Sequence, residues 1–291
     1  MNSMFIANVS GRLSLLTDET DAAEAIDVAE VSGGRFGPAP ADAYERWDDF
    51  STWLRQADLS SSPRRAFAPD ELLTPVPTPS QIFAIGLNYA DHAAEARMEL
   101  PENLIVFTKF GSSLAGAVTE VALTGPTMDW EAELVVVMGR SGRSIDEADA
   151  WDHVAGLAVG QDLSDRTVQS RGKPAQFSLG KSFAGFAPVG PVLPLSAVEH
   201  RDSLRVHSTV TVEGGEERVL QDGTTADMVF SVPAIIARLS DVVELRAGDL
   251  IFTGTPSGVG LGRDPQEFLA AGSTLHTGID QLYPITQKIT D

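Results

Sequence analysis

The chain has 291 residues, 43% of them hydrophobic and 21% charged, an ordinary composition for a globular protein that can bury a large core. Its 41 acidic and 21 basic residues give a formal net charge of −20, which argues against nucleic acid or an anionic membrane surface as a partner. It contains no cysteine, which excludes disulfides, thiolate metal ligands and a cysteine nucleophile.

The first residues, MNSMFIANVSGRLSLL, lack the basic start and the long apolar core of a signal peptide. No apolar run approaches the ~20 residues that span a bilayer. We therefore expect a soluble, cytoplasmic protein with no membrane partner.

Residues 1–60 predict short strands followed by one helix. The strands are MFIANVS, GRLSLLT and AIDVAEV. The helix begins near Pro40, and its apolar residues Tyr44, Trp47 and Leu54 recur at helical spacing.

Residues 59–81 contain five prolines, so they predict a linker or an arm draped over the surface. We place a domain boundary near residue 75. The prediction is a small N-terminal α/β domain, residues 1–75, and a larger domain, residues 76–291.

The larger domain is rich in predicted strands: QIFAIGLNY, LIVFTKF, WEAELVVVMG, VAGLAVGQD, STVTVEG and GDLIFTGTP. NYADHAAEARM, SIDEADAWDHV and SVPAIIARLSDVV predict helices, the second with Ser144 as N-cap and Glu147 completing a capping box. Many strands with few crossover helices predict an α+β, β-rich fold with a mixed or mostly antiparallel sheet.

The stretch MDWEAELVVVMG, residues 128–139, places Glu131 and Glu133 on the strand face that continues with two valines. Carboxylates ~6.6 Å apart along a strand can converge on one cation, whereas a buried pair without compensation would take up a proton. Oxygen ligands favour Mg²⁺, then Mn²⁺ or Ca²⁺. The alternative is a solvated strand end.

A second apolar strand, in AGLAVGQDLSDRTVQ, ends at Gln161 and Asp162. Site residues often follow a strand, so Asp162 is a candidate third carboxylate that leaves about three octahedral positions for water and substrate. The alternative for Asp162 is an aspartate that begins a turn.

His92 and Glu95 are neighbours on a predicted helix, at i and i+3. A histidine oriented by a carboxylate is suited to act as a general base, although a surface ion pair is the alternative. The helix carries mostly alanine, so we expect it to be weakly anchored until a ligand packs beneath it.

Lys181 lies between apolar and glycine-rich flanks, where a lysine near a metal could neutralise an enolate or a carboxylate. The glycine-rich GDLIFTGTPSGVGLG lacks the phosphate-loop and dinucleotide patterns. It predicts instead a backbone-lined pocket with a hydroxyl from Thr253 or Thr255.

Four stretches occur in order: GLNYADHAAE, DWEAELVVVMG, GQDLSDRTVQ followed by LGKSF, and GDLIFTGTPSGVG. Their combination resembles the fumarylacetoacetate hydrolase family over roughly residues 80–291. Residues 1–75 resemble the small N-terminal extension of many bacterial members. The resemblance implies a mixed β-roll fold and a homodimer.

The resemblance also implies residue roles. The family's metal ligands correspond to Glu131, Glu133 and Asp162, and the His–Glu pair of its helical lid corresponds to His92 and Glu95.

The predicted catalytic lysine is Lys181, and the predicted substrate-binding residues are Tyr89, Arg166, Gln169 and Thr255. The family's KP-x-S motif is here the sequence KFGS, residues 109–112, and Thr167 stands where the family has an acid. A distal pocket is expected from residues 97–101 and 170–177.

The family suggests a metal-dependent hydrolase that cleaves a C–C bond in a 2,4-dioxo acid such as an acylpyruvate, releasing pyruvate. In this hypothesis His92 activates water, and the metal and Lys181 stabilise the departing enolate. An oxaloacetate-type decarboxylase and a 2-hydroxy-dienoate isomerase are alternatives on the same site. A non-catalytic metal- or ligand-binding module is the alternative of another class.

Overall fold

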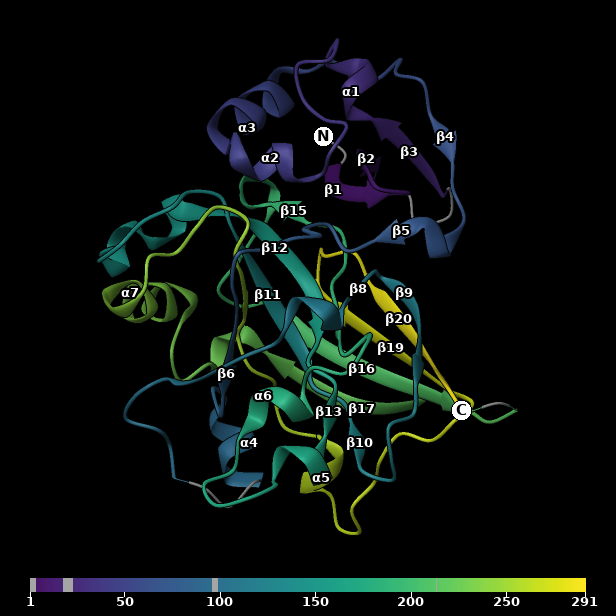
Figure 1. Cartoon of the computed structure of the whole chain (residues 1–291), viewed down its shortest axis with the longest axis vertical. Coiled ribbons are helices and arrows are strands. Elements are labelled where there is room, and N and C mark those ends of the chain that lie inside the picture. The colour runs from purple at the N-terminus through teal and green to yellow at the C-terminus, as the bar shows by residue number, and fades with distance from the viewer. Residues whose placement is uncertain (1–3, 18–22, 96–98, 213) are drawn as a thin grey trace.

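The computed structural model describes residues 4–17, 23–95, 99–212 and 214–291. The N-terminal residues form a five-stranded sheet at one end of the molecule, and two larger sheets fill the rest (Figure 1). In the described residues, no helix is long and apolar enough to cross a membrane. The predicted α+β, β-rich fold class is confirmed.

The N-terminal sheet has the strand order β4-β3-β2-β1-β5. Its strands are β1 (Met4–Val9), β2 (Arg12–Thr17), β3 (Glu24–Asp27), β4 (Arg65–Ala66) and β5 (Leu72–Leu73). Its helices are α1 (Val28–Val31), α2 (Ala41–Glu45) and α3 (Trp47–Gln56).

The central sheet has six strands in the order β15-β12-β11-β18-β6-β7. They are β6 (Ile82–Gly86), β7 (Ile105–Thr108), β11 (Ala132–Met138), β12 (Val154–Gln161), β15 (Leu193–Pro194) and β18 (Leu250–Phe252). Only β18 and β6 pair in parallel, so the sheet is mixed and mostly antiparallel, as predicted.

The third sheet has the order β17-β16-β19-β20-β9. Its strands are β9 (Val118–Ala122), β16 (Arg205–Val212), β17 (Arg218–Thr224), β19 (Ser273–Ile279) and β20 (Ile285–Thr290). Two short ladders join β10 (Met128–Asp129) to β13 (Ser164–Asp165) and β8 (Leu114–Ala115) to β14 (Ala187–Pro188). The remaining helices are α4 (Ala90–Glu95), α5 (Arg166–Gln169), α6 (Phe177–Gly180) and α7 (Val232–Val242).

Both faces of β11 are buried, and the alternation read from the sequence separates them. Leu134 and Val136 belong to one hydrophobic cluster, and Val135 and Val137 to another. The second cluster also contains residues of the N-terminal sheet and helices, among them Ile6. Because this cluster spans both parts of the chain, the boundary near residue 75 stays a prediction.

Three predicted elements differ in detail. The helix expected from Pro40 is broken at Arg46, whose φ of −125° and ψ of 37° separate α2 from α3. The expected strand AIDVAEV turns helical at Val28, where Asp27 accepts a hydrogen bond from the N–H of Glu30 as an N-cap. The proline-rich residues 59–81 are draped over the N-terminal sheet and add β4 and β5 to it.

The capping box predicted at Ser144 is wrong. Ser144 has a left-handed φ of 49°, and its N–H donates to the Ser240 carbonyl on α7. The neighbouring Ile145 is buried, which fixes this turn by packing. A 3₁₀ helix therefore begins only at Glu147 (Glu147–His153), after Asp146.

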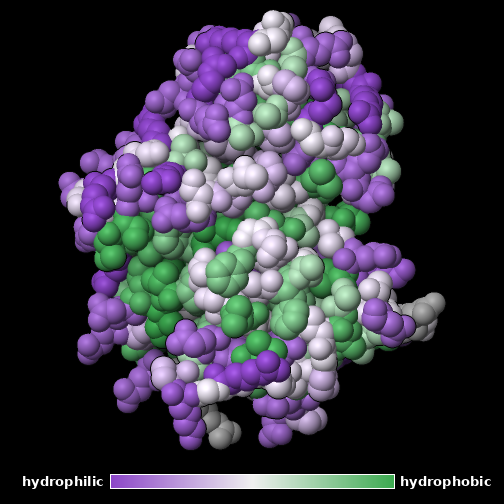
Figure 2. Space-filling model, viewed as in Figure 1, coloured by the Kyte–Doolittle hydropathy of each residue, from purple (hydrophilic) through white to green (hydrophobic). Residues whose placement is uncertain are grey.

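The surface is not uniformly polar. Figure 2 shows hydrophobic residues across the middle of one face, below the mostly hydrophilic N-terminal part. Val106, Phe110 and Leu179 are among the large apolar side chains that remain exposed.

Candidate active site

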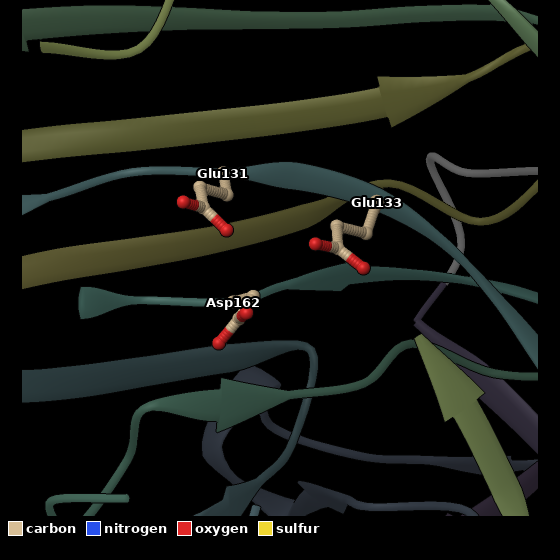
Figure 3. Close-up of side chains that lie close together, drawn as sticks. All are labelled: Glu131, Glu133 and Asp162. Carbon is tan, nitrogen blue, oxygen red and sulfur yellow. The ribbon is translucent and has the colours of Figure 1, made fainter. Parts of the chain in front are cut away.

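The pairing register of β11 and β12 assembles the three predicted metal ligands. Ala132 lies opposite Gln161, so Glu131, just before β11, faces Asp162, just after β12. The Asp162 N–H donates to the Glu131 carbonyl at 2.9 Å. Glu133 points the same way as Glu131, and one carboxylate oxygen of each residue lies within 4.8 Å of the others (Figure 3).

Two buried glutamine side chains hold the backbone at this point. Gln161 accepts the N–H of Glu131 at 2.9 Å and donates to Thr277 at 2.8 Å. Gln221 accepts the N–H of Ala132 at 3.0 Å. Because these amides satisfy buried donors at the start of β11, they fix the direction of the carboxylates.

Three buried cations meet two of the three carboxylates. The Lys181 Nζ lies 2.7 Å from Glu131 and 2.6 Å from Asp162. The Lys109 Nζ donates to the other oxygen of Asp162 and to the Lys181 carbonyl. The Arg166 Nη1 lies 2.8 Å from Glu131. The predicted lysine, Lys181, is therefore in the site, as is Lys109, for which no role was predicted.

Glu133 has no such partner among the described residues. It is buried, and its carboxylate accepts one hydrogen bond, from the N–H of Gly254 at 2.8 Å. Burial, followed by the charges of Asp162 and Glu131, raises the pKa of Glu133 well above its ordinary value. Glu133 is thus a buried carboxylate without a neutralising charge.

Glu131 behaves in the opposite way. Burial acts against its ionised form, but Lys181 and Arg166 outweigh it and lower the pKa of Glu131, with a further contribution from His92. With Asp129, four buried carboxylates stand against Lys109, Arg166 and Lys181, which leaves one carboxylate in excess.

A divalent cation fits this donor set. Three carboxylates converge, none of the three is solvent-exposed, and the group has negative charge that its lysines and arginine do not cancel. Oxygen-only ligands suit Mg²⁺, Mn²⁺ or Ca²⁺. A cation would neutralise Glu133, which otherwise favours its protonated form.

The predicted dyad is formed on α4. The His92 Nδ1 lies 3.5 Å from the Glu95 carboxylate, and both side chains are largely buried. α4 lies near the triad, close enough for the charge of His92 to contribute to the lowered pKa of Glu131.

Polar contacts join α4 to residues 257–258, and the weak anchoring expected from its alanines stays a prediction. Glu95 accepts the N–H of Gly258 at 3.1 Å. Asp91 accepts the N–H of Ser257 at 3.2 Å and its hydroxyl at 2.6 Å. Residues 96–98, and with them Arg97 of the expected distal pocket, lie outside the described residues.

Arg166 is placed by three side chains. Its Nε donates to Asp129 at 2.8 Å, and its Nη1 lies near Glu131 and donates to Gln169 at 3.0 Å. Burial opposes its charge, but the two carboxylates raise the pKa of Arg166 above its ordinary value. Gln169 therefore supports Arg166, and its contact with substrate stays a prediction.

One predicted substrate-binding residue carries a buried polar atom without a partner. Among the described residues the Tyr89 hydroxyl has no hydrogen bond, whereas the Arg166 Nη2 lies 2.8 Å from the Asp129 carboxylate. Burial, then Glu133, raises the pKa of Tyr89, so its hydroxyl is a neutral donor. Unsatisfied buried donors are costly and rare, which marks the Tyr89 hydroxyl as a donor for a polar ligand.

The two threonines of the glycine-rich segment donate hydrogen bonds to the backbone of β11 in the central sheet. Thr255 donates to the Ala132 carbonyl at 2.8 Å and accepts from Gln221 at 2.7 Å. Thr253 donates to the Leu134 carbonyl at 2.9 Å. Since the Thr255 proton is already used inside the protein, its predicted contact with substrate gains no support from this geometry and stays a prediction.

Sequence reasoning missed Lys109, Asp129 and Gln221. Lys109 lies in the KFGS segment, which the family pattern had singled out without a role. Asp129 stands two residues before Glu131, so its position in MDWEAE was an available signal. Nothing in the sequence around Gln221 marks it.

Comparison with known proteins matches residues 81–290 to the family model described as fumarylacetoacetate (FAA) hydrolase C-terminal. The mitochondrial oxaloacetate tautomerase FAHD2A of Homo sapiens is 40% identical over 220 residues, covering 75% of this chain and 68% of that protein. Oxaloacetate tautomerase YisK of Bacillus subtilis is 40% identical over 226 residues, covering 75% and 73%.

Solved structures agree over the whole chain. A candidate HpcE protein from Mycobacterium smegmatis is 46% identical, covers 99% of both chains and superposes with a TM-score of 0.90. The maleylpyruvate hydrolase of Sphingobium sp. SYK-6, solved with manganese(II) and pyruvate, is 27% identical with a TM-score of 0.78 and 99% coverage of both chains.

Proposed function

The chain belongs to the fumarylacetoacetate hydrolase family, and from that premise we propose that it is a metal-dependent oxaloacetate tautomerase. It interconverts the keto and enol forms of an oxaloacetate-like dicarboxylic acid. The tautomerases with 40% identity support this substrate. Oxaloacetate tautomerisation therefore replaces acylpyruvate hydrolysis, the main hypothesis from the sequence, as the first candidate for the function.

The observation that carries the proposal is the pairing of two features. A buried carboxylate triad with an excess negative charge lies beneath a histidine–glutamate dyad. The Tyr89 hydroxyl, a buried donor without a partner among the described residues, and the buried Arg166 guanidinium belong to the same set of residues. Tautomerisation needs this combination: one group to move a proton, and donors to hold a dicarboxylate.

Glu131, Glu133 and Asp162 would hold the divalent cation, which supplies Lewis acidity toward the C2 keto oxygen. Glu95 lies beside the Nδ1 of His92 and keeps the proton there, so the Nε2 is free to accept one. His92 removes a proton from C3, the C2–C3 double bond forms as the C2–O π bond opens, and the protonated His92 gives the proton to the C2 oxygen, which returns His92 to its neutral form. No C–C bond is broken, so neither carboxylate leaves as carbon dioxide.

The remaining residues bind and orient. The Arg166 guanidinium and the Tyr89 hydroxyl donate to substrate oxygens, and the Tyr89 hydroxyl thereby gains the partner it lacks among the described residues. Lys109 and Lys181 hold Asp162 and Glu131 in place through ion pairs. α4 covers the site and excludes water through its contacts with Ser257 and Gly258.

A C–C bond hydrolase is the second candidate. The neighbour solved with manganese and pyruvate is a maleylpyruvate hydrolase, and the dyad could equally take a proton from water. A decarboxylase has less need of the dyad, and a non-catalytic binding module has none. The choice of metal among Mg²⁺, Mn²⁺ and Ca²⁺ also belongs to the proposal, with the manganese-bound neighbour favouring Mn²⁺ as the probe.

The test compares three reactions of the purified, Mn²⁺-loaded protein. Loss of enol absorbance from freshly dissolved enol-oxaloacetate measures tautomerisation, and a coupled lactate dehydrogenase assay measures pyruvate from oxaloacetate or from acylpyruvates. We expect faster enol loss than in buffer with Mn²⁺ alone, without stoichiometric pyruvate. Pyruvate release from an acylpyruvate with no effect on the enol would establish the hydrolase instead.

A further inference from the structure

Asp129 is a buried carboxylate that the mechanism above does not use. It has 0% exposure and lies two residues before the metal ligand Glu131. One of its oxygens accepts the N–H of Gly260 at 2.7 Å and that of Trp130 at 2.8 Å. The other accepts the N–H of Leu261 at 2.9 Å and the Arg166 Nε at 2.8 Å, and lies 2.8 Å from the Arg166 Nη2. It therefore joins a backbone turn to the arginine assigned to substrate.

That turn, residues 257–262, is the segment that receives α4. Its Ser257 and Gly258 hydrogen-bond to Asp91 and Glu95 of the helix. From below, the Trp130 Nε1 donates to the Gly258 carbonyl at 3.1 Å. The turn thus has α4 on one side and residues 129–130 on the other.

Two glycines make this packing possible. A Cβ on Gly260 would lie 2.8 Å from the Asp129 carboxylate and 1.8 Å from the Glu267 carbonyl. A Cβ on Gly262 would lie 2.4 Å from the Glu95 side chain. The backbone therefore approaches both carboxylates more closely than any side chain would permit.

We propose that Asp129 is a positioning residue that fixes the Arg166 guanidinium and the 257–262 turn as one unit. Its carboxylate binds both the turn and the Arg166 guanidinium. A movement of the turn that shifts this carboxylate would therefore also weaken its charge-assisted hydrogen bond with Arg166. Substrate recognition by Arg166 and the seating of α4 are then set by the same carboxylate. The part that concerns substrate rests on the proposed function.

The first test is Asp129→Asn, which keeps the size but replaces one acceptor oxygen with a donor. Asp249→Asn is the matched control. Asp249 is also buried and accepts the N–H of Gln81 at 2.9 Å, its Nε2 at 2.7 Å and the N–H of Arg246 at 2.8 Å. It stands at the start of β18, outside the site.

Both variants should lose stability, but only Asp129→Asn should change substrate binding. We expect its KM for oxaloacetate to rise about 10- to 100-fold, the loss of one hydrogen bond to a charged group. In an Arg166→Gln background, Asp129→Asn should raise KM by less than about a further twofold, because Asp129 affects substrate binding only through Arg166. The proposal would be overturned if the rise in KM of the double variant equalled the product of the rises in the two single variants. An equal rise in KM for Asp249→Asn would also overturn it.

The second test needs neither turnover nor the Asp129 variant. Hydrogen exchange followed by mass spectrometry on the metal-loaded protein reports protection of the amides in residues 257–262. Arg166→Lys should increase exchange there about tenfold, because Asp129 loses its guanidinium partner and holds the turn less firmly. Unchanged exchange would show that the turn and Arg166 are independent. If the wild type fails to act on oxaloacetate, the proposed function is wrong, while this exchange experiment still decides the role of Asp129.

Discussion

Replacing Glu133 by glutamine tests the metal centre at the residue where the charge is unbalanced. Glutamine retains an oxygen for the Gly254 N–H and removes the one carboxylate of the triad that forms no ion pair within the described residues. The metal-free variant should therefore be at least as stable as the metal-free wild type. Its affinity for a divalent cation should fall, since the triad is reduced to Glu131 and Asp162.

The magnitude follows from linkage. At a free Mn²⁺ concentration of 100 times its Kd, the wild type should gain about 2.7 kcal/mol, which raises Tm by about 4 °C for a chain of this size. Glu133→Gln should show almost none of that shift. Differential scanning calorimetry with and without Mn²⁺ measures both values.

The control is Glu120→Gln. Glu120 is exposed, lies 3.6 Å from Lys288 and is remote in the fold from the triad, so this variant should keep the full Mn²⁺-dependent shift. A shift in Glu133→Gln as large as in the wild type would refute the assignment of Glu133 as a ligand. A metal-free Glu133→Gln that is several degrees less stable than the wild type would refute the charge argument.

Four further outcomes are expected. His92→Ala should reduce enol turnover by about 10²–10⁴, the range for losing a general base, and leave Mn²⁺ binding by calorimetry unchanged; a parallel loss of metal would contradict its role. Tyr89→Phe should raise KM yet stabilise the protein to thermal unfolding by about 1–3 kcal/mol, since a buried hydroxyl without a partner is removed; a lower Tm would count against this. The hydrogen bond from Arg218 is the main cause of the lowered pKa of Glu267. Their ion pair therefore stabilises the fold above pH about 4.5, the ordinary pKa of a glutamate, and this stabilisation is lost as the pH falls. Glu267→Gln should therefore reduce urea stability at pH 7 but not at pH 3, and an equal loss at both would exclude the ionic explanation. Sedimentation equilibrium should give a homodimer, twice the 30.9 kDa chain mass, and a monomer at micromolar concentration with full activity would exclude it.

The convergence of the three carboxylates could be predicted from the sequence because these residues break a pattern. Two glutamates interrupt an apolar strand, and an aspartate ends the next one. The antiparallel register then brings the three together without help from distant segments. Local patterns of this kind predict positions in the folded protein, because the alternation of side chains along a strand fixes which residues share a face.

Residues whose roles depend on distant contacts could not be predicted. Lys109 reaches Asp162 from 53 positions away, and its burial follows from packing that no local pattern records. Asp129 acquires its role from a turn more than 130 positions later in the chain. Ser144 has the residue type and spacing of a helix cap, but α7 takes its N–H and moves the helix start.

The register of β11 on β12 has a consequence for how the chain folds. A slip of one residue would turn Asp162 to the opposite face and leave Glu131 without its cross-strand partner. Such a misaligned chain could offer a cation only the two neighbouring glutamates, and would bind it weakly. A divalent cation held by the proposed triad would therefore stabilise the correct alignment alone, and would discriminate against misaligned strand pairings before it took part in any chemistry.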